Sequence, residues 1–369
     1  MALQKKSRLT ILIAVAAVVV VGIGIGAYFG ATQKHITPAS VNDATQGTTA
    51  GSDATTVSGG ETATSATEAK QFFTLKTSTK KNCQSTPYVV GEKKGFFRDE
   101  GLNVEYTGEL TAPQELPAVL NGTNDFTGAL PNSLATYVAG GAAIKAVTMS
   151  VIDPPADYDP KFRHMRFYVS PKSGIKTWTD FLNYKKGQKL TISGNVPSCS
   201  SFIPSQIFDK FNLDRTRLEF VTLETDTAAI QAAQQGNLDI AGVHPPFYKL
   251  AEDSGLVLVG DSADSGLGQA AGVSVFYFRD DFIAANPDPI QRFVNAIKKS
   301  QDWANSNVDE SVELTAEYIG KEVTATHYYY SGQGFPESFI QPWIDDLVSA
   351  GALKKDQVKV TDLITNEFQ

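Results

Sequence analysis

Hydroxyl, amide, thiol and imidazole side chains gather in five short segments of the sequence, each placed directly after a run of strand-forming residues. Together with the unpaired backbone N–H groups of helix N-termini, such side chains are suited to binding a small oxyanion. A single Ser or Thr here could equally be an ordinary helix cap, so the prediction depends on several of them converging. The predicted ligand-binding residues are Thr79, Asn82, Cys83 and Thr86 in segment 78–87, Thr111 in 110–114, Asn132 and Ser133 in 130–133, Asn195, Ser198, Cys199 and Ser200 in 194–201, and His244 in 243–247.

Two of these segments end the same sequence pattern, G-x-x-D-(apolar)-x-G-x-x-P. The pattern predicts a helix that ends at the first glycine, a short strand, and a second helix that begins at the proline. In open α/β sheets, ligands bind beyond the carboxyl ends of the strands, so two copies predict two ligand-facing edges. The alternative is that an α/β chain reuses this passage for topological reasons alone. The copies are Gly122, Asp125, Gly128 and Pro131, and Gly236, Asp239, Gly242 and Pro245.

Strand and helix patterns alternate from residue 72 onward. This alternation predicts an α/β protein with parallel sheets and helical crossovers. Strands are expected at 72–78, 102–108, 125–130, 144–152, 166–171, 189–194, 219–224, 239–244, 256–262 and 272–282, and the first helix at 86–101. Another helix is expected at 177–187, the chain becomes mainly helical after 282, and a short strand and turn are expected at 358–368.

The N-terminal part has a different composition. Lys5, Lys6 and Arg8 precede an apolar run at 10–31, which is long enough to cross a bilayer of about 30 Å. The basic residues predict a cytoplasmic segment 1–9, a transmembrane anchor 10–31 and an extracellular remainder. A cleaved signal, which would leave a secreted protein, is the alternative. Residues 32–70 are rich in Thr, Ser, Gly and Ala and predict a disordered stalk.

Composition and spacing exclude several function classes. The formal net charge of −8 argues against nucleic acid, whose phosphates attract a basic face. The two cysteines lack a C-x-x-C neighbour, and the four histidines lack metal-binding spacing, so no metal and no cofactor are predicted. No nucleophile-elbow motif occurs, and no catalytic residue is predicted.

The stretch YVVGEKKGFFRDEGLNVEY at 88–106 is the most specific part of the sequence. It resembles the opening of the solute-binding proteins of ABC importers for nitrate, sulfonates, taurine and thiamine-pyrimidine precursors. Gly95, Phe96, Phe97, Gly101, Leu102 and Val104 match the family pattern, as do the helix–G-x-x-D passages at Gly122/Asp125 and Gly236/Asp239. The resemblance covers about 72–369.

The resemblance implies a type II periplasmic-binding-protein fold, with two α/β lobes, two crossover hinge strands and a ligand cleft between the lobes. One lobe would comprise 71–167 and 274–369, and the other 168–273. The hinges would lie near Phe167–Ser170 and Gly272–Val275. The membrane anchor and stalk suit a cell that lacks an outer membrane, and an archaeon fits best because no cysteine is available for lipidation.

The resemblance also implies a function. The expected protein is a monomer that captures a small anionic solute, similar to a sulfonate, taurine or nitrate, and delivers it to an ABC permease and ATPase. The alternatives are a pyrimidine ligand, or an enzyme on the same fold such as a thiamine-pyrimidine precursor synthase. An extracellular sensor domain is a third class, but only a short segment precedes the anchor. The export anchor argues against a cytosolic enzyme.

Four features of the chain leave the identity of the ligand undecided. His244 stands where sulfonate and nitrate members often have a Trp-Glu-Pro-like turn, so the family's substrate cannot be transferred. Lys80 and Lys81 could supply positive charge to an anion or be solvated. Tyr328, Tyr329, Tyr330 and Phe335 could line the cleft, although core packing is favoured. Cys83 and Cys199 would both lie near the cleft, where separate thiols are favoured over a disulfide, and a thiol-reactive ligand or metal is the third option.

Overall fold

The computed structural model describes residues 72–369 except residue 224. The predicted cytoplasmic segment 1–9, anchor 10–31 and stalk 32–70 therefore lie outside the described residues. Within the described part, no helix is both long enough and apolar enough to cross a membrane.

Twelve short strands are formed by the described residues. They are β1 Phe73–Thr79, β2 Leu102–Glu109, β3 Phe126–Ala129, β4 Ile144–Met149, β5 Val151–Ile152, β6 Arg166–Val169, β7 Leu190–Ser193, β8 Leu218–Val221, β9 Ala241–Val243, β10 Val257–Asp261, β11 Val275–Arg279 and β12 Tyr328–Tyr329.

The helices separate these strands along the chain. The α-helices are α2 Thr86–Lys93, α3 Phe96–Asp99, α4 Ala112–Leu120, α5 Pro131–Ala139, α6 Cys199–Lys210, α7 Asp226–Gln235, α8 Tyr248–Asp253, α9 Asp280–Ala285, α10 Pro287–Ser306, α11 Val308–Ile319, α12 Glu337–Ser349 and α13 Val360–Leu363. The 3₁₀ turns are η1 Cys83–Ser85, η2 Pro160–Phe162, η3 Pro171–Ser173, η4 Trp178–Leu182, η5 Arg215–Arg217, η6 Pro245–Phe247, η7 Ser262–Ser265 and η8 Gly268–Gly272.

Ten of the twelve strands form two groups with the same spatial order, and β5 and β12 form a separate antiparallel pair. In the first group β1 pairs with β2 in parallel, and β11 lies antiparallel between β3 and β4. In the second group β7 pairs with β8 in parallel, and β6 lies antiparallel between β9 and β10. The prediction of purely parallel sheets is therefore wrong for β11 and β6. Each group consists of a parallel pair and a three-stranded antiparallel sheet, so we refer to the two groups as the first and second halves.

The repeated sequence pattern occupies the same place in both halves. Gly122 and Gly236 follow α4 and α7 with φ values of 78° and 82°, the left-handed conformation that glycine adopts without strain. Asp125 and Asp239 then tie the next strand to its parallel neighbour. The Asp125 carboxylate accepts a hydrogen bond from the backbone N–H of Lys76 at 2.8 Å, and Asp239 accepts the equivalent bond from Thr191 at 3.0 Å. The aspartates of the motif are therefore structural and join β1 to β3 and β7 to β9.

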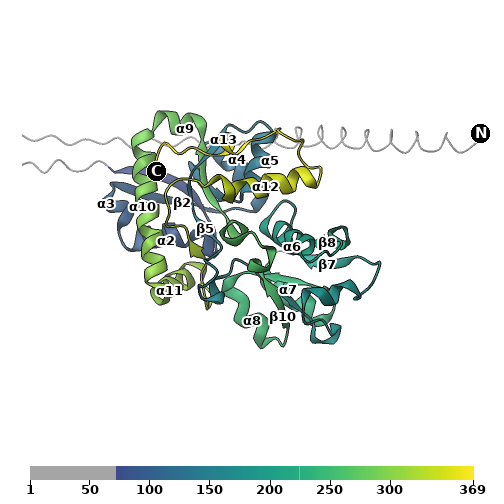
Figure 1. Cartoon of the computed structure of the whole chain (residues 1–369). Helices are drawn as coiled ribbons and strands as arrows, with labels where there is room; N and C mark the ends of the chain where they lie inside the picture. The colour runs from purple at the N-terminus through teal and green to yellow at the C-terminus, as the bar shows by residue number, and fades with distance from the viewer. Residues whose placement is uncertain (1–71, 224) are drawn as a thin grey trace, which may run out of the picture. The chain divides into compact units, whose positions relative to one another are not determined.

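Two passages of the chain connect the halves. Residues 150–165 lead from β4 to β6, and residues 262–274 lead from β10 to β11. They pair with each other where Ser150 donates to Ser274 at 2.7 Å and Ser274 donates to Val151 at 3.0 Å. The predicted crossing near Gly272–Val275 falls on this pair, whereas Phe167–Val169 lie inside β6, which is paired on both sides. Figure 1 shows α6, α7 and α8 together with β7, β8 and β10 on one side of this connection.

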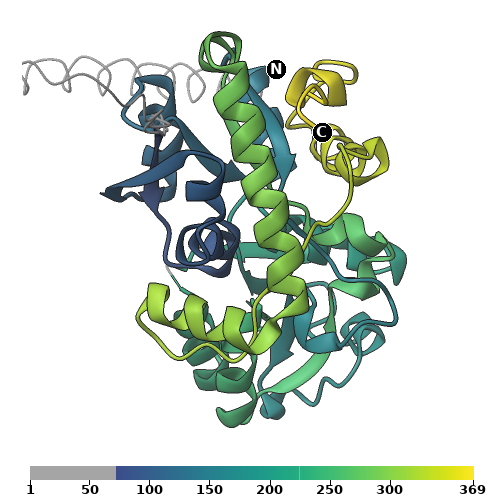
Figure 2. The ribbon, with the colours of Figure 1, turned by 90° about the vertical axis from the view of Figure 1, so that its left-hand side faces the viewer.

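Apolar packing explains the long C-terminal helices. Helix α10 packs against α2 and α3 in the first half, with α11 beside α2, as Figure 2 shows. Its buried Phe293 contacts Phe126 of β3 and Phe278 of β11, with ring centroids 4.8 and 5.2 Å apart. Buried aromatic side chains of this size supply much of a core's stabilisation.

Several predicted elements differ in detail. The helix expected at 86–101 is divided into α2 and α3, because Gly95 between them has a φ of 79°. The helix expected at 177–187 is only the 3₁₀ turn η4, and the strand expected near the C-terminus is the helical turn α13 followed by a single bridge between Ile364 and Ala146.

The first of the two lysines considered as anion-binding groups is structural. Lys80 is largely buried, donates to the carbonyl of Gly128 at 2.9 Å, and lies 3.7 Å from the carboxylate of Glu115. That carboxylate also accepts hydrogen bonds from Ser78 and Thr127. Burial lowers the pKa of Lys80, and the Glu115 charge opposes this effect. Lys80 therefore belongs to a buried polar network in the first half.

The two motif aspartates provide a matched test of the repeat. Asp239 also accepts hydrogen bonds from Tyr184 and Lys185, whereas Asp125 has only its bond to Lys76 among the side-chain contacts described. We expect Asp239→Ala to lower the free energy of unfolding by about 2–3 kcal/mol and Asp125→Ala by about 1 kcal/mol, measured by urea denaturation. Equal losses, or no loss in Asp239→Ala, would contradict this assignment.

The Lys80 network predicts an asymmetric response to mutation. Glu115→Gln removes the counter-charge of a buried ammonium group, so we expect a loss of about 2–3 kcal/mol in unfolding free energy. The double variant Glu115→Gln/Lys80→Met should recover part of that loss, because it removes the unpaired charge as well. Thermal denaturation of both variants checks this, and a neutral Glu115→Gln would show that the pair has no structural role.

Candidate functional site

A pocket of about 450 Å³ is lined by residues of both halves. The first half contributes the loop after β1, and the second half contributes the loops before α6, α7 and η6. A more open depression of about 860 Å³ near Lys145, Asp280 and Thr361 lies elsewhere in the first half. The smaller pocket is the candidate site because the predicted polar segments meet there. The predicted residues that line it are Asn82, Cys83, Asn195, Ser198, Cys199, Ser200 and His244.

The other predicted residues lie outside this pocket lining. Thr79 ends β1 opposite Glu109, and the buried Thr86 joins α2 to α11 through a 2.8 Å hydrogen bond to Thr315. Thr111 caps α4 in a capping box with Gln114. The partners of Thr86 and Thr111 are those of an ordinary structural Thr, whereas Thr79 is placed only by its strand register.

Asn132 and Ser133 connect the halves directly. The Asn132 side chain donates to the carbonyl of Ser198 at 3.2 Å, and the Ser133 hydroxyl donates to the carbonyl of Pro197 at 3.4 Å. The ending of the first motif copy therefore contacts the segment 194–201 of the second half. These two hydrogen bonds join the halves and can stabilise one arrangement of the halves relative to each other.

The segment before α6 is organised by its own serines. Ser198 donates to the carbonyl of Asn195 at 2.6 Å, and its hydroxyl lies 2.7 Å from that of Ser200. Ser198 is the N-cap of α6, and Thr225 is the N-cap of α7. Both helices begin at the pocket, where their N-terminal dipoles favour a negatively charged group. Lys81 and Lys321 also line the pocket and add positive charge.

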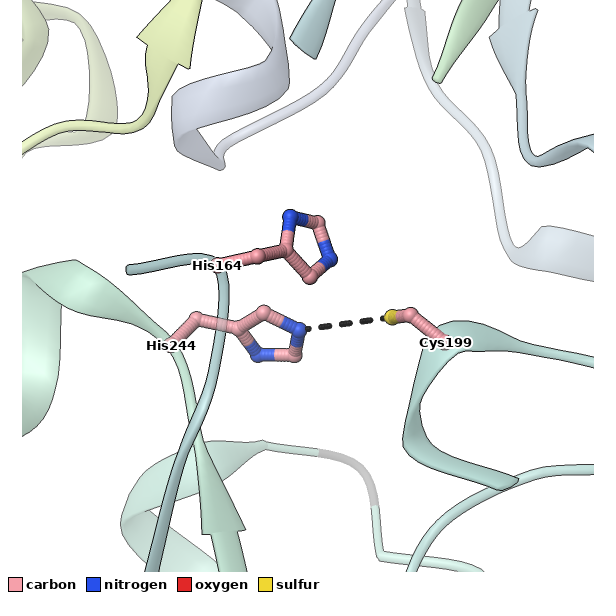
Figure 3. A group of neighbouring side chains, drawn as sticks. All are labelled: His164, Cys199 and His244. Atoms are coloured by element: carbon pink, nitrogen blue, oxygen red, sulfur yellow. Dashed lines mark hydrogen bonds between the residues drawn. The ribbon is translucent and has the colours of Figure 1, made fainter. Parts of the chain in front are cut away.

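His244 is held by a carboxylate that the sequence analysis missed. The Asp226 carboxylate lies 2.9 Å from Nδ1 of His244 and accepts a 2.8 Å hydrogen bond from its backbone N–H. Because a carboxylate accepts and does not donate, Nδ1 carries the proton and Nε2 points away. Nε2 lies 3.5 Å from the Cys199 sulfur (Figure 3). Burial alone would lower the pKa of His244, but the Asp226 charge and hydrogen bond raise it well above the ordinary value.

Two further histidines lie next to His244. The rings of His164 and His327 stack with centroids 4.7 Å apart, and the His164 ring lies 5.6 Å from that of His244. Both are buried, and burial lowers the pKa of each well below the ordinary value, so both rings are neutral near pH 7. His327 lines the pocket, while His164 lies fully buried. No local spacing in the sequence indicated this cluster, because its members come from separate segments.

The cysteines remain separate thiols. Cys83 and Cys199 are both buried and unpaired, which agrees with the favoured alternative for them. Burial raises the pKa of the Cys83 thiol, which keeps it protonated. The nearby aromatic group behaves as core: Tyr329, Tyr330 and Phe335 are buried, and Tyr329 donates to the carbonyl of Cys83 at 2.8 Å.

Comparison with known proteins agrees with this architecture. A protein of Brucella abortus, whose assignment as a binding protein is provisional, is 20% identical over 233 residues, which are 63% of this chain and 66% of that protein. The match thus spans slightly less than two thirds of that relative.

Solved structures with low sequence identity show the same fold. The periplasmic aliphatic sulphonate-binding protein SsuA from Escherichia coli has a TM-score of 0.60 at 19% identity, over 79% of this chain and 92% of its own. The periplasmic nitrate-binding protein NrtA from Synechocystis PCC 6803 has a TM-score of 0.62 at 13% identity, over 81% and 87%. The fold also occurs in an enzyme, the desulfurization enzyme DSZB, with a TM-score of 0.53 at 13% identity, over 80% and 97%.

The fold of residues 72–369 is thus an α/β fold of the periplasmic-binding-protein kind. The sequence profile described as NMT1/THI5 like matches residues 82–311, which is well over half of the chain. The resemblance that we noted at 88–106 falls inside this match. The chain belongs to the NMT1/THI5-like family.

Proposed function

We propose that this protein captures a small anionic solute in the pocket between its halves and delivers it to an ABC permease and ATPase. The observation that carries the proposal is the composition of the pocket, to which both halves contribute polar side chains. A ligand that contacts both halves binds a closed arrangement more tightly than an open one and so shifts the population toward closure. No catalytic residue is needed for that task.

The charges of the pocket support an anionic solute, similar to a sulfonate, taurine or nitrate. Two helix N-termini begin there, and Lys81, Lys321 and His244 line it. Among the described lining residues, Asp226 is the acidic one, and its carboxylate is engaged by His244. Lys81 is paired with Glu109, so Lys321 and the two helix N-termini are the groups that would favour an anion over a neutral pyrimidine.

An enzyme on the same fold is the second candidate, and one observation favours it. The Cys199 sulfur contacts Nε2 of His244, and Nδ1 of His244 contacts Asp226. A nucleophile, its general base and the group that orients the base have the same arrangement. Turnover of a bound compound with loss of activity in Cys199→Ala would support this candidate over a binding protein.

A thermal-shift screen with a matched pair of variants tests solute capture. Taurine, alkanesulfonates, nitrate, bicarbonate and hydroxymethylpyrimidine are added to the purified chain. A true solute at 100 times its Kd should stabilise the protein by about 2.7 kcal/mol.

Asn195→Ala, in the pocket, should weaken binding about tenfold through the loss of one hydrogen bond to a charged ligand. Thr111→Ala, at the distant α4 cap, should leave affinity unchanged. Equal affinity in Asn195→Ala, or no shift with any compound, would contradict the proposal.

The proposal includes a retained anchor at 10–31, with the pocket on the outer side of the membrane. We expect the full-length chain to stay in the membrane fraction after alkaline carbonate extraction, and a chain that begins at residue 32 and carries a separate cleavable signal to be released into the medium. Proteolysis of intact cells should remove the folded part. Release of the full-length chain would instead indicate a cleaved signal.

A further inference from the structure

Three potential metal ligands meet beside the pocket: Cys199 and His244 line it, and His164 is buried behind them. His164, Cys199 and His244 each offer a ligand atom, and these atoms all lie within 4.8 Å of one another. Figure 3 shows the two imidazole rings and the thiol reaching one another from three separate segments of the chain. His164 precedes β6, Cys199 is the first residue of α6, and His244 precedes η6.

The distances between the three ligand atoms are close to those found around a bound metal ion. Zn²⁺ binds imidazole nitrogen at about 2.0–2.1 Å and thiolate sulfur at about 2.3 Å, so tetrahedral ligand atoms lie roughly 3.3–3.7 Å apart. The Cys199 sulfur and Nε2 of His244 are already 3.5 Å apart. The His164 ligand atom lies within 4.8 Å of the other two, so it has to approach by at most about 1.5 Å.

His164 provides an independent reason to expect a ligand. Its side chain is fully buried, and neither ring nitrogen has a hydrogen-bond partner among residues 72–369. Buried polar atoms are rarely left unpaired, because each such atom costs about 1–3 kcal/mol. Nδ1 of the adjacent His327 is unpaired in the same part of the structure. A metal ion would give the His164 ring the partner that it lacks, since an imidazole nitrogen is a common metal ligand.

Asp226 has the position that carboxylates take behind metal-binding histidines. Such a histidine usually donates its second ring N–H to a carboxylate, which fixes the tautomer and orients the other nitrogen toward the metal. The contact of Asp226 with Nδ1 of His244 leaves Nε2 facing Cys199. A thiol nucleophile and its base would have the same arrangement. That alternative leaves the buried ring nitrogens of His164 without a hydrogen-bond partner.

We propose that His164, Cys199 and His244 bind a divalent transition-metal ion with the coordination chemistry of Zn²⁺, with Asp226 as a positioning residue. Ligands of mixed imidazole and thiolate type select such ions over Mg²⁺ and Ca²⁺, which require oxygen. Three protein ligands leave a fourth tetrahedral position, which a donor atom of the solute can occupy. Only this last step rests on the proposed function.

Cobalt substitution tests the site in the full-length chain. The protein is stripped with EDTA under reducing conditions and titrated with Co²⁺ or Zn²⁺. We expect one ion per chain, with the d–d absorption of tetrahedral Co²⁺ and a sulfur-to-cobalt charge-transfer band. Cys199→Ser should abolish the charge-transfer band, and Asp226→Asn should weaken Zn²⁺ binding 10–100-fold. Cys83→Ser is the matched control, because Cys83 is a second buried thiol of the same pocket outside the three-ligand group, and its spectrum should be unchanged.

Alkylation of the wild-type protein avoids dependence on the folding of variants. Zn²⁺ should slow the reaction of iodoacetamide with Cys199, as followed by peptide mass spectrometry. Absence of stoichiometric Co²⁺ and Zn²⁺ binding, a charge-transfer band that persists in Cys199→Ser, or alkylation that Zn²⁺ does not slow would overturn the metal site. Solute binding by an EDTA-treated chain that takes up no metal would overturn the metal site alone. Metal binding without any solute response would overturn the proposed function alone.

Discussion

The floor of the pocket depends on the contact between Asp226 and His244. One carboxylate accepts hydrogen bonds from both the backbone and the ring of the histidine, so it fixes where the loop before η6 lies and which ring nitrogen faces Cys199. Asp226 begins α7 and Cys199 begins α6. The contact therefore joins the loops that follow β8 and β9 and orients them toward the helix after β7. Its loss would leave the loop before η6 and the His244 ring without the carboxylate that fixes their positions.

The two halves have a common construction but different endings. Each has a parallel strand pair, a short strand tied to it by a motif aspartate, and an antiparallel strand beyond. The glycines and aspartates of the repeat serve this construction and do not touch the pocket lining. The endings of the two copies differ. Asn132 and Ser133, directly after Pro131, reach across to the segment 194–201, whereas His244, directly before Pro245, lines the pocket. We infer that the first ending helps to hold the halves together and that the second takes part in ligand recognition.

Local patterns allowed much of the fold to be predicted. The glycines at 122 and 236 require a left-handed conformation, and each does end a helix. Pairing direction could not be predicted, because it depends on which distant strand lies alongside: β11 returns from residue 275 to insert between β3 and β4. The rule that ligands lie beyond strand ends singled out His244 and segment 194–201, and the structure has a pocket lined by these residues. The same rule applied to β8 would have identified Asp226, but an acidic residue in a first helical turn has an ordinary role there. The grouping of His164 and His327 with His244 could not be found, since His164 lies 80 positions before His244 and His327 lies 83 positions after it (244 − 164 and 327 − 244).

The central claim is that a solute draws the two halves together around the pocket. Leu120 of the first half and Leu258 of the second are exposed, so spin labels on Leu120→Cys and Leu258→Cys, in a background in which both native cysteines are replaced by serine, report the separation of the halves. Pulsed electron paramagnetic resonance distances should be compared with and without a solute that shifts the melting temperature. The account predicts a shorter and narrower distance distribution when the solute is bound. A distribution that stays unchanged at saturating solute would contradict it.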